Sequence, residues 1–558
     1  MTSPTTGPTT VTTDHDVVVI GAGFAGVYLV HKLRDRLGLR VRGFERGEDV
    51  GGTWYWNRYP GARCDFESEF YSYSFDEDIQ QEWDWSEKYA AQPEILSYIR
   101  HVADRLDVRR SISFETSVTS ARFDESHDVW HVSTDRGETV TATYVVAATG
   151  ILSVPARPRF EGMDDFAGSI YHTGDWPHEG VDFTGQDVAV IGTGSSGIQA
   201  IPEIAQQAAQ LTVFQRTATF SVPASNRALQ EHERRATKRN YTRLRKAAED
   251  TRGGILLELA IGDFQSSDPV VVRAELERRW RASGVSVAAT LSDTLLSQEA
   301  NEFVADFVRD KINETVEDPA TAALLEPRDY PIGTKRLALD TDYYDTYNRP
   351  NVSLVSVRES PIRRFTERGL LVGDREYAVD AIVLATGFDA ITGALERIDI
   401  TGTGGRTLRE AWAEGPTSYL GLMVHGFPNL FTVTGPGSPA VLTNVVASIE
   451  HHVGWIADHI QHLRDAGITR VEADAQAQAD WVAHVAELAG RTLFARAASW
   501  YMGANIPGKP RVFMAYLGGF RAYRERCELV AASGYEGFIH QTAPREAAVT
   551  ATSERTTA

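Results

Sequence analysis

Cysteine is scarce in this chain of 558 residues, which contains only Cys64 and Cys527 and no CxxC pair. A disulfide scaffold, a thiolate metal site and a thiol-redox site are therefore disfavoured, and a reducing compartment fits. Long apolar runs are also missing, because no stretch reaches the roughly 18 to 20 residues that cross a bilayer. The first residues are polar rather than a signal peptide. We expect a cytoplasmic protein with no membrane association and no metal.

Basic residues are also fewer than acidic residues. The chain has 56 Lys and Arg against 76 Asp and Glu, a formal net charge of -20. Nucleic acid is an unfavourable partner for such a surface, and nothing in the sequence requires an obligate protein partner. The length favours two or three domains. The polar ends, 1–14 and 541–558, are expected to be flexible tails.

A nucleotide-binding pattern opens the ordered part of the chain. The apolar residues 16–20 predict a buried strand, which leads into the glycine motif 21–26 (GAGFAG) and then a helix. Such glycines permit a tight turn and a close approach of the backbone to a pyrophosphate. A second strand, 40–44, delivers Glu45, nineteen residues after the last glycine. An acid at this position binds the ribose hydroxyls of adenosine.

The same pattern recurs with the opposite charge. The strand 187–191 leads into 192–197 (GTGSSG), and a strand at 211–215 ends at Arg216, again nineteen residues after the last glycine. A cation here attracts a 2′-phosphate, although a solvated arginine at a strand end is the plain alternative. We therefore predict FAD in the first site and NADPH in the second, with hydride passing from NADPH to the flavin.

Two apolar strands end in Thr-Gly, at 149–150 and 386–387. They predict crossovers between discontinuous domains. The expected fold class is α/β, with two Rossmann-like domains and a helical insertion. The expected boundaries are 15–150 and 387–540 for the FAD domain, 151–225 and 331–386 for the NADP domain, and 226–330 for the insertion.

Residues 166–177 match the FxGxxxHxxxWP fingerprint of the type I Baeyer–Villiger monooxygenases at Phe166, Gly168, His172, Trp176 and Pro177. The chain also resembles that family at 51–65, 333–336, 435–439 and 500–505, and the similarity spans roughly 16–538. Within the family it is most similar to the phenylacetone and steroid monooxygenase branch.

This resemblance implies an enzyme that uses NADPH and O2 to convert a ketone to an ester or lactone, through a flavin C4a-peroxide and a tetrahedral Criegee-type adduct. It implies that Asp65 orients Arg336, whose guanidinium lies against the flavin and stabilises developing negative charge. His172 is assigned a positioning role at the interdomain linker.

The remaining site residues follow from the two glycine motifs and the resemblance together. The residues expected to hold FAD are Gly21, Gly23, Phe24, Gly26, Glu45, Thr53, Trp54, Asp65, Tyr71 and Val118. Those expected to hold NADP are Arg63, Thr193, Gly194, Ser195, Ser196, Gly197, Gln199, Arg216, Thr217, Lys335, Arg336 and Trp500. The apolar residues Ala440, Val441 and Leu442 are expected to border the substrate pocket.

Three other functions compete with this interpretation. A flavin monooxygenase that oxidises nitrogen or sulfur shares both glycine motifs, but the Trp176-Pro177 ending and the Lys335-Arg336 pair disfavour it. A pyridine-nucleotide reductase predicts a redox-active disulfide, which Cys64 and Cys527 do not offer. A non-catalytic nucleotide sensor would not need Asp65 and Arg336.

Overall fold

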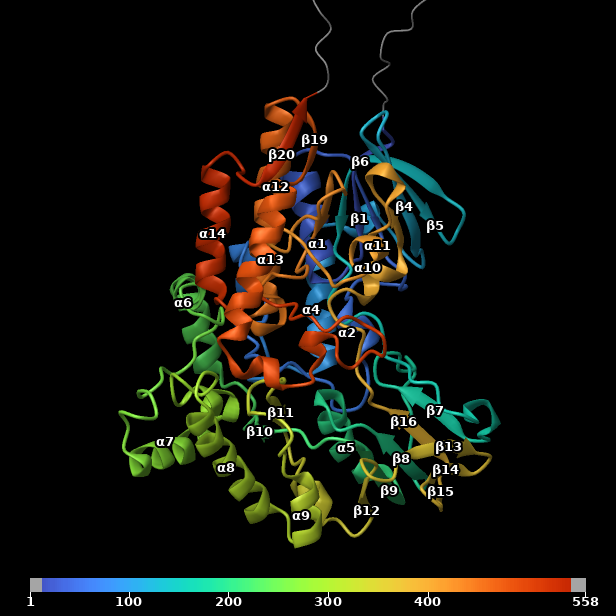
Figure 1. Cartoon of the computed structure of the whole chain (residues 1–558), viewed down its shortest axis with the longest axis vertical. Coiled ribbons are helices and arrows are strands. Elements are labelled where there is room, and N and C mark those ends of the chain that lie inside the picture. Colours follow the sequence, from blue (N-terminus) through green and yellow to red (C-terminus); the bar gives the residue numbers. More distant parts are fainter. Residues whose placement is uncertain (1–12, 543–558) are drawn as a thin grey trace, which may run out of the picture.

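The computed structural model of the chain describes residues 13–542. Two bodies lie one above the other, joined by a narrow middle region (Figure 1). Most of the two expected tails lies outside the described residues. Within the described part, Asp14 accepts a hydrogen bond from the Thr141 backbone N–H at 2.8 Å, and Gln541 belongs to the last strand.

The upper body is built on an eight-stranded sheet in the order β17-β4-β5-β6-β1-β2-β3, with β18 also paired to β6. Parallel pairing joins β1 to β2 and β6, whereas β4, β5 and β6 form an antiparallel meander. The strands are β1 His15–Ile20, β2 Val41–Phe44, β3 Ile112–Ser113, β4 Val118–Asp124, β5 Val129–Thr134, β6 Thr139–Ala147, β17 Asp399–Thr401 and β18 Leu430–Thr432.

Both faces of this mixed sheet are covered, as is usual for its parallel strands. Val17 and Val19 of β1 pack into one apolar core, and Val18 and Ile20 into a second core on the other face. Helices of the first core are α1 Phe24–His31, α4 Gln92–Arg105, α12 Val445–Asp465, α13 Ala475–Gly490 and α14 Phe520–Ala532, and those of the second are α10 Gly393–Arg397 and α11 Leu408–Ala411.

The lower body contains a five-stranded parallel sheet in the order β12-β9-β8-β16-β7. One face packs on α5 (Ser195–Gln207) and the other on a three-stranded sheet, β13-β14-β15. The strands are β7 Ser169–His172, β8 Asp187–Ile191, β9 Gln210–Gln215, β12 Val352–Ser356, β13 Ile362–Thr366, β14 Gly369–Val372, β15 Arg375–Ala378 and β16 Ala381–Leu384.

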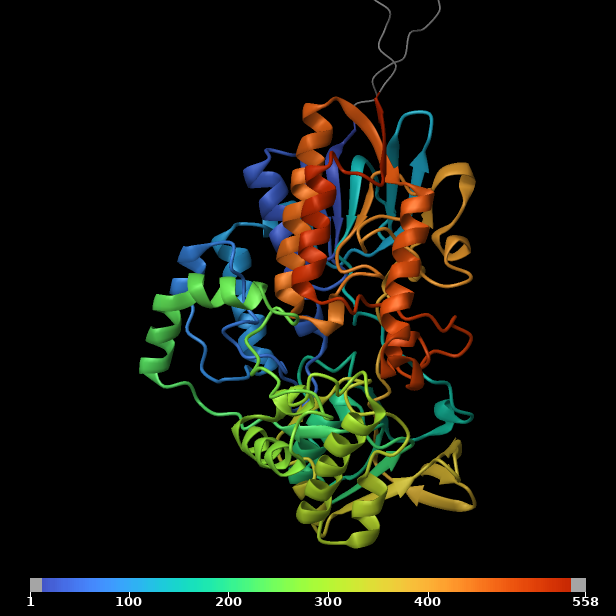
Figure 2. The same ribbon diagram turned by 60° about the vertical axis from the view of Figure 1, so that its left-hand side comes forward.

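The region expected to be a helical insertion is mainly helical, but its helices separate. α7 (Pro269–Ala282), α8 (Gln298–Thr315) and α9 (Pro319–Leu325) lie in the lower body beside the strand pair β10 (Ser221–Pro223) and β11 (Ala338–Asp340). In contrast, α6 (Glu231–Glu249) packs against residues 66–85 of the upper body, as Figure 2 shows.

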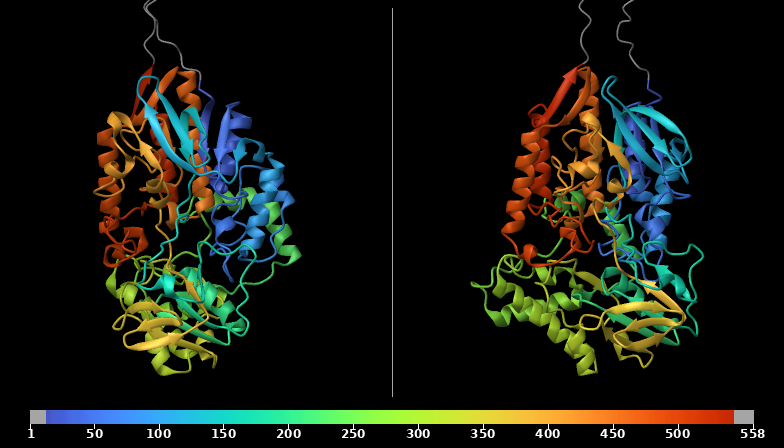
Figure 3. Two further views of the ribbon diagram at one scale, coloured as in Figure 1. Left: turned by 90° about the vertical axis from the view of Figure 1, so that its right-hand side faces the viewer. Right: turned by 45° about the vertical axis from the view of Figure 1, so that its right-hand side comes forward.

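The remaining elements are α2 Thr53–Trp56, α3 Glu77–Glu82, and the hairpin of β19 Ile468–Ala473 with β20 Phe538–Thr542. The chain passes from the upper to the lower body after β6 and returns after β16 (Figure 3). Between these two passages it visits the upper body once more, through α6. Both passages follow a Thr-Gly turn, because a strand that ends at the carboxyl edge of its sheet delivers the chain to the space between the bodies. Among residues 13–542, no helix is both long and apolar enough to cross a bilayer.

Candidate active site

The first glycine motif is a turn that only glycine fits. Gly21 has φ +105°, and a Cβ there would lie 2.5 Å from the carbonyl oxygen of Ala148. At Gly26, a Cβ would lie 1.9 Å from the carbonyl oxygen of Gly21. No side chain caps the N-terminus of α1 at Gly23. The free N–H groups of that helix end therefore suit a pyrophosphate.

Glu45 lies at the carboxyl end of β2, directly beside this turn. Its side chain accepts hydrogen bonds from the backbone N–H groups of Ala22 and Gly47, both at 2.8 Å. Burial raises the pKa of Glu45, and these two N–H donors oppose the rise. A carboxylate fixed in this way is in place to receive the hydroxyls of a ribose.

Phe24, Trp54 and Tyr71, three other residues expected to hold FAD, pack in one cluster. The Trp54 indole N–H donates to the Tyr71 hydroxyl at 3.1 Å, and Phe24 packs edge-on against Tyr71. Thr53 begins α2. Val118 begins β4 just after Thr116, whose backbone N–H donates to the Glu45 carbonyl. The structure brings these residues together around one turn.

The second glycine motif has the same construction between β8 and α5. Gly192 has φ +110°, and a Cβ on it would lie 2.5 Å from the Ala385 carbonyl oxygen, while one on Gly197 would lie 2.3 Å from that of Gly192. Gly194 faces open space, and no side chain caps α5, whose first residues are Ser195 and Ser196. This helix end also suits phosphate groups.

Two cations beside the second turn lack acidic partners. Neither Arg216 nor Lys335 forms an ion pair within residues 13–542, and the Lys335 amine instead lies 4.3 Å from the centre of the Tyr330 ring. Burial, and then the charge of Arg216, lower the pKa of Lys335. Thr193 ties the turn to Thr217 by donating to its carbonyl at 3.0 Å. Two mutually repelling cations next to an open glycine turn favour an anion such as a 2′-phosphate.

Arg336 and Asp65 form a two-bond ion pair in the region between the bodies. Nε and Nη2 of Arg336 each donate to one carboxylate oxygen of Asp65 at 2.6 Å, and Nη1 donates to the Val441 carbonyl at 3.0 Å. Each side chain of the pair is 26% exposed. Burial alone would lower the pKa of Arg336, but the charge and hydrogen bonds of Asp65 outweigh it and raise that pKa. The guanidinium is thus held charged in one orientation.

Aromatic rings surround this pair. The guanidinium of Arg336 lies 5.0 Å from the centre of the Phe66 ring. Burial raises the pKa of Tyr501 to about 12, although Arg336 opposes the rise. Trp500 packs on Tyr501 with ring centres 4.2 Å apart and contacts the core that includes Ala390 and Ile391. The rings restrict the solvent around the charged pair.

His172 binds both passages of the chain between the bodies. Its Nδ1 accepts the Gly174 N–H at 2.9 Å, so Nε2 carries the proton and lies 3.1 Å from the Thr386 hydroxyl and 3.3 Å from the Ala156 carbonyl. Burial lowers the pKa of His172. A neutral imidazole therefore joins the segment after β6 to the segment after β16.

The rest of the fingerprint fixes the strand that carries His172. A Cβ on Gly168 would lie 2.2 Å from the Asp380 carbonyl oxygen, and Phe166 is buried. Trp176 packs against Phe183, and the Pro177 carbonyl accepts the N–H of a following glycine. These contacts hold β7 at the edge of the lower sheet.

Two residues expected to bind NADP have protein partners in the structure. Nη1 of Arg63 donates to Glu87 at 3.0 Å. The amide of Gln199 accepts from the Tyr59 hydroxyl at 2.8 Å and donates to the Arg63 carbonyl at 3.1 Å. Gln199 thereby fastens the loop before Asp65 to helix α5.

Sequence reasoning missed residues that hold the C-terminal loop against the second passage. Lys509 forms an ion pair with Asp389 and another with Glu396 at 3.4 Å, and the Asn505 amide donates to the Phe388 carbonyl at 2.7 Å. No spacing or motif signals these contacts, since the partners are more than a hundred residues apart.

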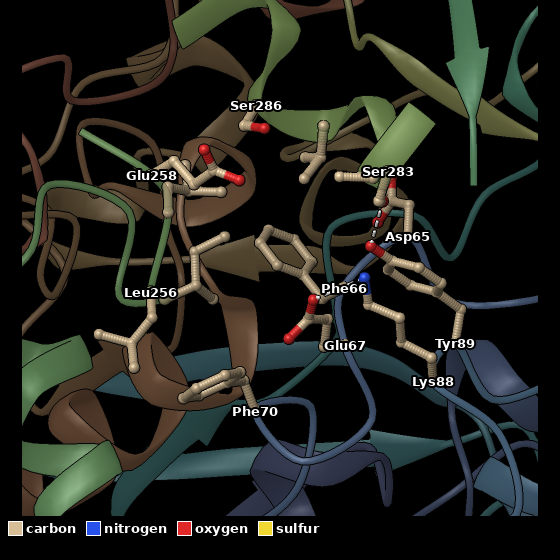
Figure 4. Close-up of a pocket in the computed structure, with 14 residues that line it drawn as sticks. Asp65, Phe66, Glu67, Phe70, Lys88, Tyr89, Leu256, Glu258, Ser283 and Ser286 are labelled. Carbon is tan, nitrogen blue, oxygen red and sulfur yellow. Dashed lines mark hydrogen bonds and ion pairs between the residues drawn. The ribbon is translucent and has the colours of Figure 1, made fainter. Parts of the chain in front are cut away.

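A pocket of about 120 Å³ borders Asp65 (Figure 4). Its lining includes Phe66, Phe70, Tyr89 and Leu256. Of the residues expected at the substrate pocket, Ala440 and Val441 are buried and Leu442 packs in a neighbouring core. None of the three is among the residues that line this 120 Å³ pocket, and their role at the substrate stays a prediction. Only the Val441 carbonyl, bonded to Arg336, connects them with the charged pair.

The chain is similar to proteins of known family. Residues 18–249 match the family described as pyridine nucleotide-disulphide oxidoreductase. However, Cys64 and Cys527 are both free and buried, so they provide no redox disulfide.

The chain is 44% identical to a Baeyer-Villiger monooxygenase of Pseudooceanicola batsensis, over 95% of this chain and 97% of that protein. It is 42% identical to the phenazine N-monooxygenase PhzNO1 of Lysobacter antibioticus, over 95% and 98%. The solved structure of an oxidized steroid monooxygenase bound to NADP is 51% identical and superposes with a TM-score of 0.90, covering 94% of this chain and 99% of that one. The chain belongs to the type I Baeyer–Villiger monooxygenase family, whose members use FAD and NADPH.

Proposed function

We propose that Arg336 is the catalytic cation of this enzyme and that Asp65 positions it. As a member of its family the chain uses NADPH and O2 to convert a ketone to an ester or lactone. The observation that carries the residue assignment is the two-bond ion pair beside the pocket that Asp65 lines. FAD, which the first glycine turn and Glu45 would hold, would supply the electrons that activate O2 for insertion next to the carbonyl carbon.

The residues around the glycine turns fit these two cofactors. The uncapped ends of α1 and α5 and the close-packed glycines leave room for pyrophosphates. Glu45 suits the ribose of FAD, and Arg216 with Lys335 suits the 2′-phosphate of NADPH. Trp500 contributes a ring beside Tyr501 against which a cofactor can lie.

Arg336 supplies charge stabilisation that remains constant over the working pH range. A guanidinium has five N–H donors, and three of those on Arg336 are engaged by Asp65 and Val441. Two remain for an oxygen of the substrate. A fixed donor aimed at a developing oxyanion in a partly dry site contributes typically ~3 to 4 kcal/mol to the reaction barrier.

The Arg336→Ala variant tests this assignment. It should still bind FAD and be reduced by NADPH, while ester formation falls by ~10²- to 10³-fold, which is the loss typical of one such donor. Arg336→Lys should recover little, because an ammonium cannot make both bonds to Asp65. Flavin reduction is followed by its absorbance in stopped flow, and the ester by chromatography. Unchanged ester formation in Arg336→Ala would remove Arg336 from the chemistry.

A second candidate activity is oxidation of a heteroatom. The similarity to a phenazine N-monooxygenase, over nearly the whole of both chains, favours it. Parallel assays with a ketone and with an aromatic amine or phenazine, scored by product, separate the two activities.

We also propose a cytoplasmic location and activity without an obligate protein partner. Two free, buried cysteines fit a reducing compartment. Turnover by the purified chain alone, at dilutions where a complex would dissociate, tests the second point.

A further inference from the structure

Two pockets of this protein share one wall. The inner pocket, of about 120 Å³, borders Asp65. The outer pocket, of about 410 Å³, lies between residues 83–85 and helix α6 and is lined by the rings of Trp83, Trp85 and Tyr241. Glu67 and Lys88 are the two residues that line both pockets.

Those two residues form an ion pair. The Lys88 amine lies 3.2 Å from a carboxylate oxygen of Glu67, and their side chains are 21% and 36% exposed. In Figure 4 the Lys88 amine lies between Phe66 and Tyr89, and the Glu67 carboxylate lies next to Phe66. A partly exposed pair of this kind contributes little to stability, so it can separate without disturbing the fold.

The backbone on either side of the pair is fixed. The Lys88 N–H donates to the Arg227 carbonyl at 2.9 Å, and the Lys88 carbonyl accepts the Ser68 N–H at 2.8 Å. The Glu67 carbonyl accepts the N–H groups of Phe70 and Tyr71. Opening therefore requires only rotation of two side chains, a fast motion, and no movement of a loop.

The charges around both pockets are compensated. Four acidic and four basic side chains line the outer pocket, and among them Lys238 pairs with Asp84 at 2.8 Å and Arg227 with Glu233 at 2.6 Å. In the inner pocket, Asp65 pairs with Arg336 and Glu258 with Arg278. The two linings mix balanced charges with the rings of Phe66, Tyr89, Trp83, Trp85 and Tyr241, and a neutral molecule with a ring system can pack on those rings without meeting a net charge.

We propose that the Glu67–Lys88 pair is a side-chain gate, and that a bulky neutral ketone with an apolar ring system extends through it from the outer pocket toward Arg336. The inference rests on the proposed function. The inner pocket alone is smaller than the ~300 to 1,000 Å³ of most small-molecule sites, whereas the two pockets joined fall within that range. A small ketone fits inside with the gate closed, and a bulky ketone requires it open.

Charge variants test the gate. Lys88→Met keeps the apolar stem and removes the charge, and Glu67→Gln keeps the shape. Each should raise kcat/KM for a bulky aryl or polycyclic ketone by up to roughly fivefold, the range that such a pair supports, and leave a small aliphatic ketone unchanged. The double variant Glu67→Lys with Lys88→Glu, which reverses the pair, should restore the wild-type ratio of kcat/KM for the bulky ketone to kcat/KM for the small ketone. Lys311→Met, which breaks the distant 2.7 Å pair with Glu277, is the control. Equal effects on both ketones, or no effect, would overturn the gate.

Blocking the outer pocket provides a second test. Because Cys64 and Cys527 are buried, a cysteine introduced at Ala236, which lines the outer pocket, can be labelled selectively with a bulky maleimide. Labelling should lower kcat/KM for the bulky ketone at least tenfold, with flavin reduction by NADPH and small-ketone turnover unchanged. Arg235→Cys, on an exposed residue of α6 that does not line the pocket, is the matched control. Undiminished bulky-ketone turnover after labelling at 236 would show that this substrate enters elsewhere.

These tests separate the gate from the proposed function. If the wild type converts no ketone but oxygenates sulfides, the ketone assignment fails, and the same variants are scored with a small and a bulky sulfide. Size-selective effects would then support the gate, and uniform effects would overturn it.

Discussion

Two arginines of this chain carry the same charge in opposite surroundings. Arg336 donates two hydrogen bonds to the Asp65 carboxylate and a third to the Val441 carbonyl. Arg216 is exposed and has no ion pair among residues 13–542. The first is held in one orientation, as a cation needs to be if it stabilises a transient charge. The second is free to pair with an anion that arrives from solution.

Replacing Arg216 with Ala should therefore change the choice between NADPH and NADH. The KM for NADPH should rise by roughly ten- to a hundredfold, since hydrogen bonds to charged groups contribute about 1.5 to 3 kcal/mol, while the KM for NADH should change little. Steady-state rates of flavin reduction with both cofactors measure this. Arg363→Ala, at an exposed arginine paired with Asp374, is the control. An equal loss for both cofactors would contradict a contact with the 2′-phosphate.

At the scale of elements, each nucleotide-binding turn depends on contact between backbone atoms. In both turns the last glycine packs against the carbonyl of the first, Gly26 on Gly21 and Gly197 on Gly192. No rotamer change relieves such a contact, because the clashing atom belongs to the main chain. The strand, turn and helix therefore form one rigid unit.

Gly26→Ala should abolish FAD binding and lower the yield of folded protein, since its Cβ would lie 1.9 Å from a backbone oxygen. Gly454→Ala is the matched control, because Gly454 lies inside helix α12 and a Cβ there meets nothing within 4 Å. That variant should retain FAD and gain about 0.5 to 1 kcal/mol in the free energy of unfolding. The ratio of flavin to protein absorbance and the thermal midpoint measure both effects. Full flavin content in Gly26→Ala would contradict the packing argument.

At the scale of the whole molecule, the arrangement of the two bodies depends on a few contacts in the middle region. His172 joins the two passages of the chain, Gln199 binds the loop that leads to Asp65, and Lys509 pairs with Asp389. These contacts hold segments of the chain together in the region between the two bodies.

The stability of the molecule should fall in mild acid. His452 and His459 of α12 are fully buried, and burial lowers the pKa of each well below its usual value. The unfolded chain takes up these protons near pH 6.5 and the folded chain does not, so stability is complete above that pH and declines below it. The loss is about 1.4 kcal/mol per histidine for each pH unit.

Urea denaturation at pH 7.5 and 5.5 measures this loss. His459 stacks on Tyr535 with ring centres 3.8 Å apart, so a phenylalanine at this position should keep the packing. His459→Phe should therefore lose less free energy of unfolding between pH 7.5 and 5.5 than the wild type, by the contribution of one histidine. Leu259→Ala, at a residue that is 88% exposed and has no titratable group, is the control and should leave the loss unchanged. Equal acid sensitivity in wild type and His459→Phe would show that this imidazole does not titrate on unfolding.

The sequence by itself determined what depends on neighbours in the chain. Both glycine turns, the charges of Glu45 and Arg216 and the fingerprint at His172 are local patterns, and they predicted the α/β class, FAD and NADPH, and the family to which the chain belongs. The domain boundaries and the roles of the single site residues stay predictions.

Only the tertiary structure decided which distant residues meet. The pairing of Arg336 with Asp65 spans 271 positions, and only the resemblance to a family implied it. Nothing in the sequence indicated three other contacts: the ion pair of Lys509 with Asp389, the packing of α6 against the upper body, and the wall that two pockets share. Such contacts depend on how the two bodies lie against one another. Side-chain spacing along a chain carries no information about that arrangement, because it reports only neighbours within a few turns.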